Sequence, residues 1–122
     1  MILQMRKKIY HLATCSTCIE ILKRVKPGAD VELQDIKTQQ ITEAQIDEMK
    51  ALCGTYEALF SRRALKYKSM GLASQKLTEE DYRRLILSEY TFLKRPVFLL
   101  GNQIFIGNAP KTVDEVIAAF AL

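Results

Sequence analysis

The residues with the clearest chemical potential are Cys15 and Cys18, which are separated by Ser16 and Thr17. They follow a predicted strand and open a predicted helix. At a helix N-terminus, free backbone N–H groups and the helix dipole favour the thiolate, which is the nucleophilic form of cysteine. A second thiol one turn along can attack a mixed disulfide formed on the first. The spacing therefore predicts a redox pair in which Cys15 is the exposed attacking thiol and Cys18 the more buried resolving thiol.

Other roles remain open for these cysteines. A zinc site needs four ligands, and only His11 and Cys53 could complete it, at spacings that zinc sites rarely use, so we expect no metal. The pair could instead be inert core residues, since free cysteine is often buried. A structural disulfide is disfavoured in a reducing compartment. We expect Cys53, at the end of a predicted helix, to be a packing residue.

Three further positions are candidates for the same site. His11 ends the predicted strand four residues before Cys15, where it could add positive potential or assist proton transfer, or simply pack on one sheet face. Arg95 precedes another predicted strand, and Pro96 stands at its start, a place that suits a residue without a backbone N–H. Arg63 lies in the basic run 61–68. That run is either a solvated helix face or a site for an anion or a partner, because arginine makes planar contacts to oxyanions and carboxylates.

The elements that would position these residues follow from apolar periodicity and from turn residues. Strands are predicted at 7–12, 30–36, 96–100 and 103–106. Helices are predicted at 16–25, after a cap at Thr42, at 61–70, after a cap at Thr78, and after a capping box at 112–115. The order is a β-α-β unit, a helical block over about 42–90, a β-hairpin and a final helix, which predicts the α/β class.

Length and composition restrict the class of protein further. The 122 residues are 48% hydrophobic and 26% charged, which is typical of one globular domain spanning 1–122. A net charge of +4 is too small to predict nucleic-acid binding. No apolar run is long enough to cross a membrane, and the opening residues do not form a signal peptide, so we expect a cytoplasmic protein with no membrane partner.

Several of these motifs together resemble the ArsC/Spx family, which includes the glutaredoxin-linked arsenate reductases. The resemblance covers about residues 7–121 and rests on residues 9–11, the cysteine pair, the inserted helices, 66–72 and 93–97. It implies a thioredoxin-like fold with a mixed four-stranded sheet. It also implies that Cys15 is the active cysteine and that a cis Pro96 faces it, with Arg95 alongside.

The two branches of this family imply different functions. Arsenate reductases use one cysteine and several arginines, and they pass their adduct to glutathione and glutaredoxin. Spx-like regulators use a cysteine pair as a redox switch and bind the C-terminal domain of the RNA polymerase α-subunit. Here Cys18 and Arg63 match the Spx pattern, although the reductase's middle arginine would fall near Ser61. Ile19 replaces a frequent arginine, and the late arginine expected near Ile106 or Gly107 is missing.

A doubly charged oxyanion needs several fixed cationic donors, so the depleted arginine set disfavours arsenate as the substrate. The resemblance and the residues together predict a thiol-disulfide reductase that uses glutathione or a thioredoxin-type thiol and binds no cofactor. Arg95 would lower the pKa of the thiolate or hold an anionic co-substrate, and His11, Arg63 and Pro96 would contribute to substrate binding. An Spx-like regulator and an arsenate reductase are the two alternatives.

Overall fold

The computed structural model describes residues 6–121. These residues form two compact units. The first, here called the sheet unit, comprises the described residues up to Gln39 and those from Arg95 onwards, and the second, the helical unit, comprises Gln40–Lys94. The assignment of a single domain spanning 1–122 stays a prediction.

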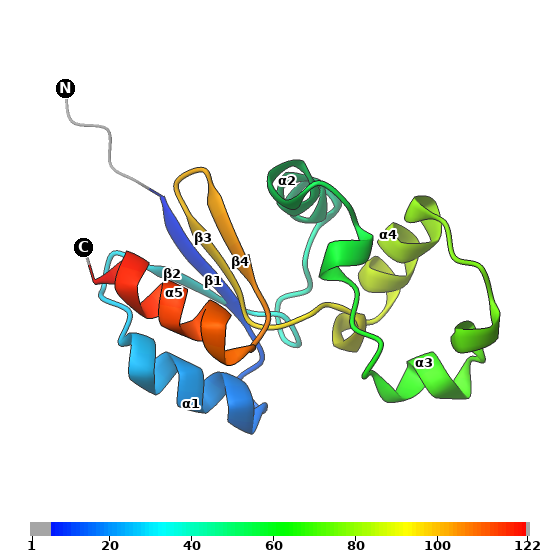
Figure 1. The fold of residues 1–122 in the computed structure, drawn as a ribbon, viewed down its shortest axis with the longest axis horizontal. Coiled ribbons are helices and arrows are strands. Elements are labelled where there is room, and N and C mark those ends of the chain that lie inside the picture. The colour runs from blue at the N-terminus through cyan, green and yellow to red at the C-terminus, as the bar shows by residue number, and fades with distance from the viewer. Residues whose placement is uncertain (1–5, 122) are drawn as a thin grey trace. The chain divides into compact units, whose positions relative to one another are not determined.

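The sheet unit is built on four short strands with a mixed arrangement. The strands are β1 (Lys7–His11), β2 (Glu32–Asp35), β3 (Val97–Leu100) and β4 (Gln103–Ile106). Their order in the sheet is β2-β1-β3-β4 (Figure 1). β1 pairs in parallel with β2 and antiparallel with β3, which in turn pairs antiparallel with β4. This confirms the α/β class that the sequence pattern predicts and the mixed four-stranded sheet that the family resemblance implies.

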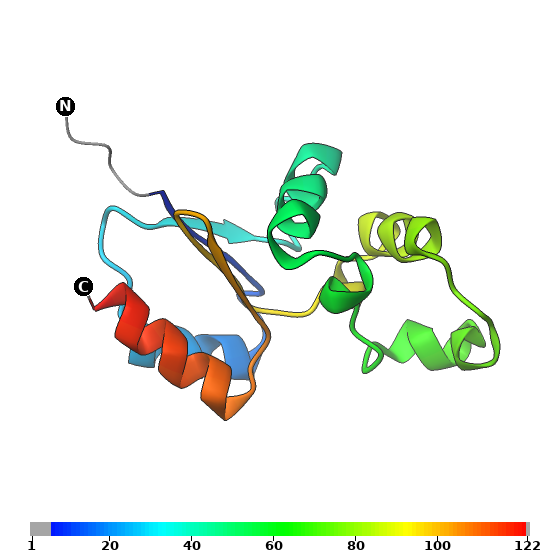
Figure 2. The ribbon, with the colours of Figure 1, turned by 45° about the horizontal axis from the view of Figure 1, so that its top comes forward.

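Two helices lie side by side on one face of this sheet, α1 (Ser16–Val25) and α5 (Pro110–Phe120) (Figures 1 and 2). They bury an apolar core against β1 and β3. The fully or nearly fully buried members of that core are Ile9, Ile21, Phe98, Val113 and Val116. Because β1 and α1 share this core, the end of β1 and the start of α1 are held in a fixed relation.

The helical unit has a different organisation, with three α-helices and three short 3-10 helices. The α-helices are α2 (Glu43–Cys53), α3 (Leu65–Ser69) and α4 (Glu79–Ser88), and the 3-10 helices cover Glu57–Leu59, Leu72–Ser74 and Tyr90–Phe92. The ring of Phe60 packs against the rings of Tyr67, Tyr82 and Phe92. No helix in the part of the chain from 6 to 121 is long and apolar enough to cross a membrane.

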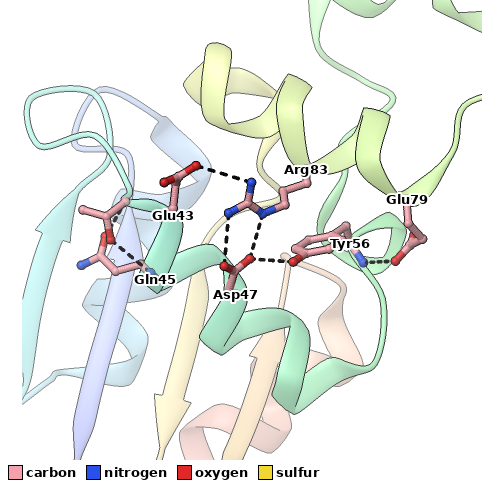
Figure 3. A network of polar contacts seen from close by, with 7 residues as sticks. Glu43, Gln45, Asp47, Tyr56, Glu79 and Arg83 are labelled. Carbon is pink, nitrogen blue, oxygen red and sulfur yellow. Dashed lines mark hydrogen bonds and ion pairs between the residues drawn. The ribbon is translucent and has the colours of Figure 1, made fainter.

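A polar network joins α2 to α4 within the helical unit (Figure 3). Arg83 of α4 donates to both carboxylate oxygens of Asp47 on α2, at 2.9 and 3.2 Å, and lies 3.6 Å from Glu43. The hydroxyl of Tyr56 donates to the same carboxylate at 2.6 Å. These donors lower the pKa of Asp47 to about 2, with the hydrogen bond from Arg83 as the largest cause. Glu79 accepts hydrogen bonds from the backbone at the start of the first 3-10 helix.

The structure confirms most predicted elements and corrects several boundaries. The strands expected over 7–12 and 96–100 are each one residue shorter. The strand expected over 30–36 is shorter, and the helix expected over 61–70 is reduced to α3 because the residues before it form turns. The predicted capping box at 112–115 is wrong. α5 begins three residues earlier, with Ala109 rather than Thr112 at the cap and Pro110 in the first turn, because proline's fixed φ suits the first helical position. The capping boxes at Thr42 and Thr78 are confirmed.

Candidate functional site

Cys15 lies at the junction between β1 and α1. It is the N-cap residue of α1, with an extended backbone and no side chain capping the helix. Its N–H donates to the carbonyl of Leu12 at 3.0 Å, and its own carbonyl accepts from the N–H of Ile19 at 3.0 Å. Cys18 follows in the first turn of α1. The helix therefore begins directly at the cysteine pair, as the sequence predicts.

The loop before Cys15 is held by the end of β2. The carboxylate of Asp35 accepts hydrogen bonds from the N–H groups of Ala13, at 3.4 Å, and Lys37, at 3.2 Å. The N–H of Ile36 donates to the carbonyl of His11 at 2.9 Å. These contacts join the strand end, the loop and the turn after β2, so they limit how far the loop that carries Cys15 can move.

The environment of Cys15 favours its ionised form. Its partial burial raises the pKa, but several groups outweigh that effect and leave the pKa below the ordinary value. The largest of them are hydrogen bonds from the backbone and side chain of Cys18, followed by one from the backbone of Thr17 and the positive charge of Arg95. Backbone N–H groups in the first turn of a helix thus stabilise the thiolate, as expected for a nucleophilic cysteine.

The environment of Cys18 has the opposite effect. Its side chain is fully buried, and this burial is the largest cause that raises the pKa of Cys18 to about 11. The neighbouring Cys15 raises it further, while a hydrogen bond from the backbone of Leu12 and the charge of Arg95 lower it. Two thiols one turn apart therefore have pKa values displaced in opposite directions. Such a pair can divide the work of attack and resolution.

Arg95 and Pro96 come to this site from the other end of the sheet unit's sequence. The peptide bond between them is cis, and the Pro96 carbonyl accepts from the N–H of Gly107 at 2.9 Å. The charge of Arg95 lowers the pKa of both cysteines. The expectation of a cis proline before β3 is confirmed.

The other residues singled out from the sequence are His11, Arg63 and Cys53. His11 is the last residue of β1 and is half-buried. Arg63 belongs to the helical unit, where it is exposed just before α3, so its part in the site stays a prediction. Cys53 ends α2, and its thiol donates to the carbonyl of Thr55. All three cysteines of the chain are free thiols. Among residues 6–121, no cluster of three His, Cys, Asp or Glu side chains is arranged to hold a metal ion.

Two residues of the site, Leu12 and Asp35, were missed in the sequence analysis. Leu12 acts through its backbone, which accepts from Cys15 and contacts the thiol of Cys18. Asp35 is distant in sequence and meets the loop only because β2 pairs in parallel with β1. A side-chain pattern cannot reveal a backbone contact, but an acidic residue at the end of a strand that neighbours a reactive loop is a signal for a tether.

Comparison with known sequences decides the family. A model of the ArsC family matches residues 10–116, which is most of the chain. The chain belongs to the ArsC family. An arsenate reductase from Haemophilus influenzae is 27% identical over 121 residues, an alignment that covers 89% of this chain and 97% of that protein.

Solved structures share the fold of this ArsC-family protein. An arsenate reductase from Vibrio cholerae is similar with a TM-score of 0.77 at 19% identity, covering 93% of this chain and 99% of that one. An ArsC-related protein from Brucella melitensis is similar with a TM-score of 0.70 at 21% identity, covering 100% of both chains. At these identities the likeness establishes the ArsC fold, which is thioredoxin-like.

Proposed function

We propose that this ArsC-family protein is a thiol-disulfide oxidoreductase in which Cys15 attacks the substrate and Cys18 resolves the intermediate. The observation that carries the proposal is the opposite displacement of the two pKa values. The pKa of Cys15 is lowered, while that of Cys18 is raised to about 11. A nucleophile must be ionised near neutral pH, whereas a resolving thiol must stay protonated until the mixed disulfide has formed.

The reaction begins when the Cys15 thiolate attacks one sulfur of a substrate disulfide. A bond forms between Cys15 Sγ and that sulfur, the substrate S–S bond breaks, and the other substrate sulfur leaves as a thiolate. Cys18 then gives up its proton and attacks Cys15 Sγ. This second step forms the Cys15–Cys18 disulfide and releases the first substrate sulfur as a thiol. The substrate gains two electrons, and the cysteine pair loses two.

Two equivalents of glutathione or one thioredoxin-type dithiol would return the pair to its reduced state. Either reductant supplies two electrons and two protons, and it leaves as a disulfide. Arg95 supports both halves of this cycle because its charge stabilises thiolate on either cysteine. His11 lies four residues before Cys15 and Pro96 directly precedes β3. Both would contact the incoming disulfide, and we include Arg63 as a further substrate contact.

Reduction of arsenate is a second candidate, favoured by the name of the Haemophilus influenzae relative. Arsenate would use the same low-pKa Cys15 and the same Arg95. Two features of the sheet unit count against it. Ile19 is 41% exposed next to the pair, and β4 ends at Ile106 where the resemblance would place a late arginine. A buried dianion without those cations would be poorly compensated.

The proposal is tested by turnover of bis(2-hydroxyethyl) disulfide and of arsenate, each with glutathione or with a thioredoxin system as the reductant. Cys15→Ser should abolish disulfide reduction, and Cys18→Ser should reduce it strongly, while Cys53→Ser serves as the matched control and keeps full activity. Equal disulfide turnover by wild type and Cys15→Ser would refute the proposal. Turnover of arsenate but not of the disulfide would establish the second candidate instead.

A cytoplasmic location is part of this proposal, because a reducing compartment keeps all three cysteines available as thiols. An Spx-like regulator is the remaining alternative to the proposed reductase. It expects the C-terminal domain of the RNA polymerase α-subunit to bind one redox state of the Cys15–Cys18 pair in preference to the other. Isothermal titration of that domain with the oxidised and the reduced protein distinguishes the reductase from the regulator. Equal binding to both redox states, or no binding, would rule out the regulator.

A further inference from the structure

A stretch of the helical unit carries positive charge without any negative charge. Residues 58–78 contain five cations and neither Asp nor Glu. Two of the five are neutralised from outside the stretch, Arg62 by Glu57 at 2.7 Å and Lys66 by Glu89 at 2.6 Å. The other three, Arg63, Lys68 and Lys76, form no ion pair with another residue of the described chain. The stretch therefore presents uncompensated positive charge to solvent.

Large apolar side chains are exposed within the same basic stretch. α3 buries none of its residues. Leu65 is 88% exposed and Met70 is 48% exposed, although both are large hydrophobic side chains. We call Arg63, Leu65, Lys68 and Met70 the α3 surface. Leu65 and Lys68 lie within a five-residue helix that is only about 8 Å long, and Arg63 and Met70 lie within two residues of its ends, so the four side chains are within reach of one partner.

The α3 surface is displayed by an anchored segment. Ala64, just before α3, is 9% exposed, and Leu72, just after it, is 4% exposed. Within α3 the ring of Tyr67 packs edge-on against Phe60, with centroids 5.9 Å apart. Buried residues on both sides and one aromatic contact in the middle hold the helix in place. Leu65 and Met70 are therefore presented outward from a fixed support.

We propose that the α3 surface is a docking site for an acidic, amphipathic segment of another protein. Carboxylates of the partner pair with Arg63 and Lys68, and apolar side chains of the partner cover Leu65 and Met70. An apolar centre with a charged rim is the usual anatomy of a protein–protein contact. The charge identifies the partner as acidic, because this stretch offers cations and no anion.

Other anionic partners suit the α3 surface less well. Nucleic-acid phosphates would pair with the cations but would leave Leu65 in water, and single-stranded bases would need exposed aromatic rings to stack on. Tyr67 is packed against Phe60 and does not offer its ring freely. A helix of five residues with two outward apolar side chains is short for interfacial membrane binding, which relies on a long apolar face.

The test measures binding of a fluorescent synthetic peptide in which glutamates flank leucine and phenylalanine. Leu65→Ser should weaken binding by about tenfold, since burying a leucine contributes on the order of 1.5–3 kcal/mol and 1.4 kcal/mol is a factor of ten. Lys68→Glu should weaken binding by a similar factor, and its effect should shrink as salt is raised. The matched controls are Leu33→Ser and Lys111→Glu, which change an exposed leucine and lysine of the sheet unit.

Each arm of the experiment has a decisive outcome. Binding that falls in the Leu65 and Lys68 variants but not in the controls supports the proposal. Equal binding of an all-glutamate peptide would show that charge alone is recognised and would overturn it. The proposal would also be overturned if duplex DNA or phosphatidylglycerol vesicles bound the protein, the peptide did not, and Leu65→Ser abolished that binding. Disulfide reduction should be unchanged in all four variants, so this test is independent of the proposed redox function.

Discussion

The two cysteines should differ sharply in their reaction with an alkylating reagent. At pH 8 a thiol with a pKa of about 11, as for Cys18, is about 0.1% thiolate. A cysteine at the ordinary pKa of 9.0 is about 9% thiolate at the same pH, and Cys15 lies below that pKa. The thiolate ratio therefore favours Cys15 by at least about 90-fold. The complete burial of Cys18 adds to this preference because the reagent must also reach the sulfur.

The assay treats reduced protein with a limiting amount of iodoacetamide at pH 8 and locates the label by peptide mass spectrometry. A Cys53→Ser background removes competition from the third thiol. Labelling should occur almost entirely at Cys15. Raising the pH to about 11, where about half of Cys18 is ionised, should reduce the ratio of labelling at Cys15 to labelling at Cys18. Protein unfolded in guanidinium is the control and should be labelled at both sites. Comparable labelling of Cys15 and Cys18 in the folded protein at pH 8 would refute the reasoning.

Other variants test the remaining contacts. Arg95→Gln should raise the pKa of Cys15 and slow its alkylation at pH 7, because a charge that favours the thiolate is lost. Arg95→Lys keeps the charge and should alkylate at nearly the wild-type rate. A pH–rate profile of Arg95→Gln that matches the wild-type profile would contradict this. Asp47→Asn should lower the urea midpoint at pH 7, and the difference from wild type should shrink as pH falls from about 4 towards 2, since the folded pKa of Asp47 lies below its ordinary 3.8. A gap that stays constant with pH would mean that the carboxylate charge does not matter. Phe98→Ala should lower the free energy of unfolding in urea by about 3–5 kcal/mol, because it empties a buried core position. Leu33→Ala, at an exposed strand position, should lower it by under about 0.5 kcal/mol. Similar losses in the two variants would contradict the core assignment.

The sequence predicts the parts of this protein in which local pattern and tertiary packing agree. α1 begins and ends where its apolar spacing indicates, because Cys18 and Ile21 face the core and Lys26, with a left-handed backbone, ends the helix. β4 also matches its prediction. The cysteine pair at the strand-to-helix junction follows from its motif, and the cis bond before β3 follows from the family resemblance.

The errors have physical causes of their own. The run 61–70 has good helix formers, yet α3 buries no side chain and so gains little from packing, which leaves only a short helix. In α5 the pattern at 112–115 competes with Pro110, and the fixed φ of proline starts the helix first. The Asp35 tether depends on strand pairing, and the Leu12 contact is a local backbone turn. A side-chain pattern encodes neither.

The central claim is that Cys15 attacks and Cys18 resolves, and trapping the intermediate tests it most directly. Cys18→Ser in a Cys53→Ser background is incubated with glutathione disulfide and analysed by intact and peptide mass spectrometry. We predict that a mixed disulfide with glutathione accumulates on Cys15, whereas protein that retains Cys18 proceeds to the Cys15–Cys18 disulfide. Failure of the adduct to form on Cys15, or its persistence when Cys18 is present, would contradict these roles.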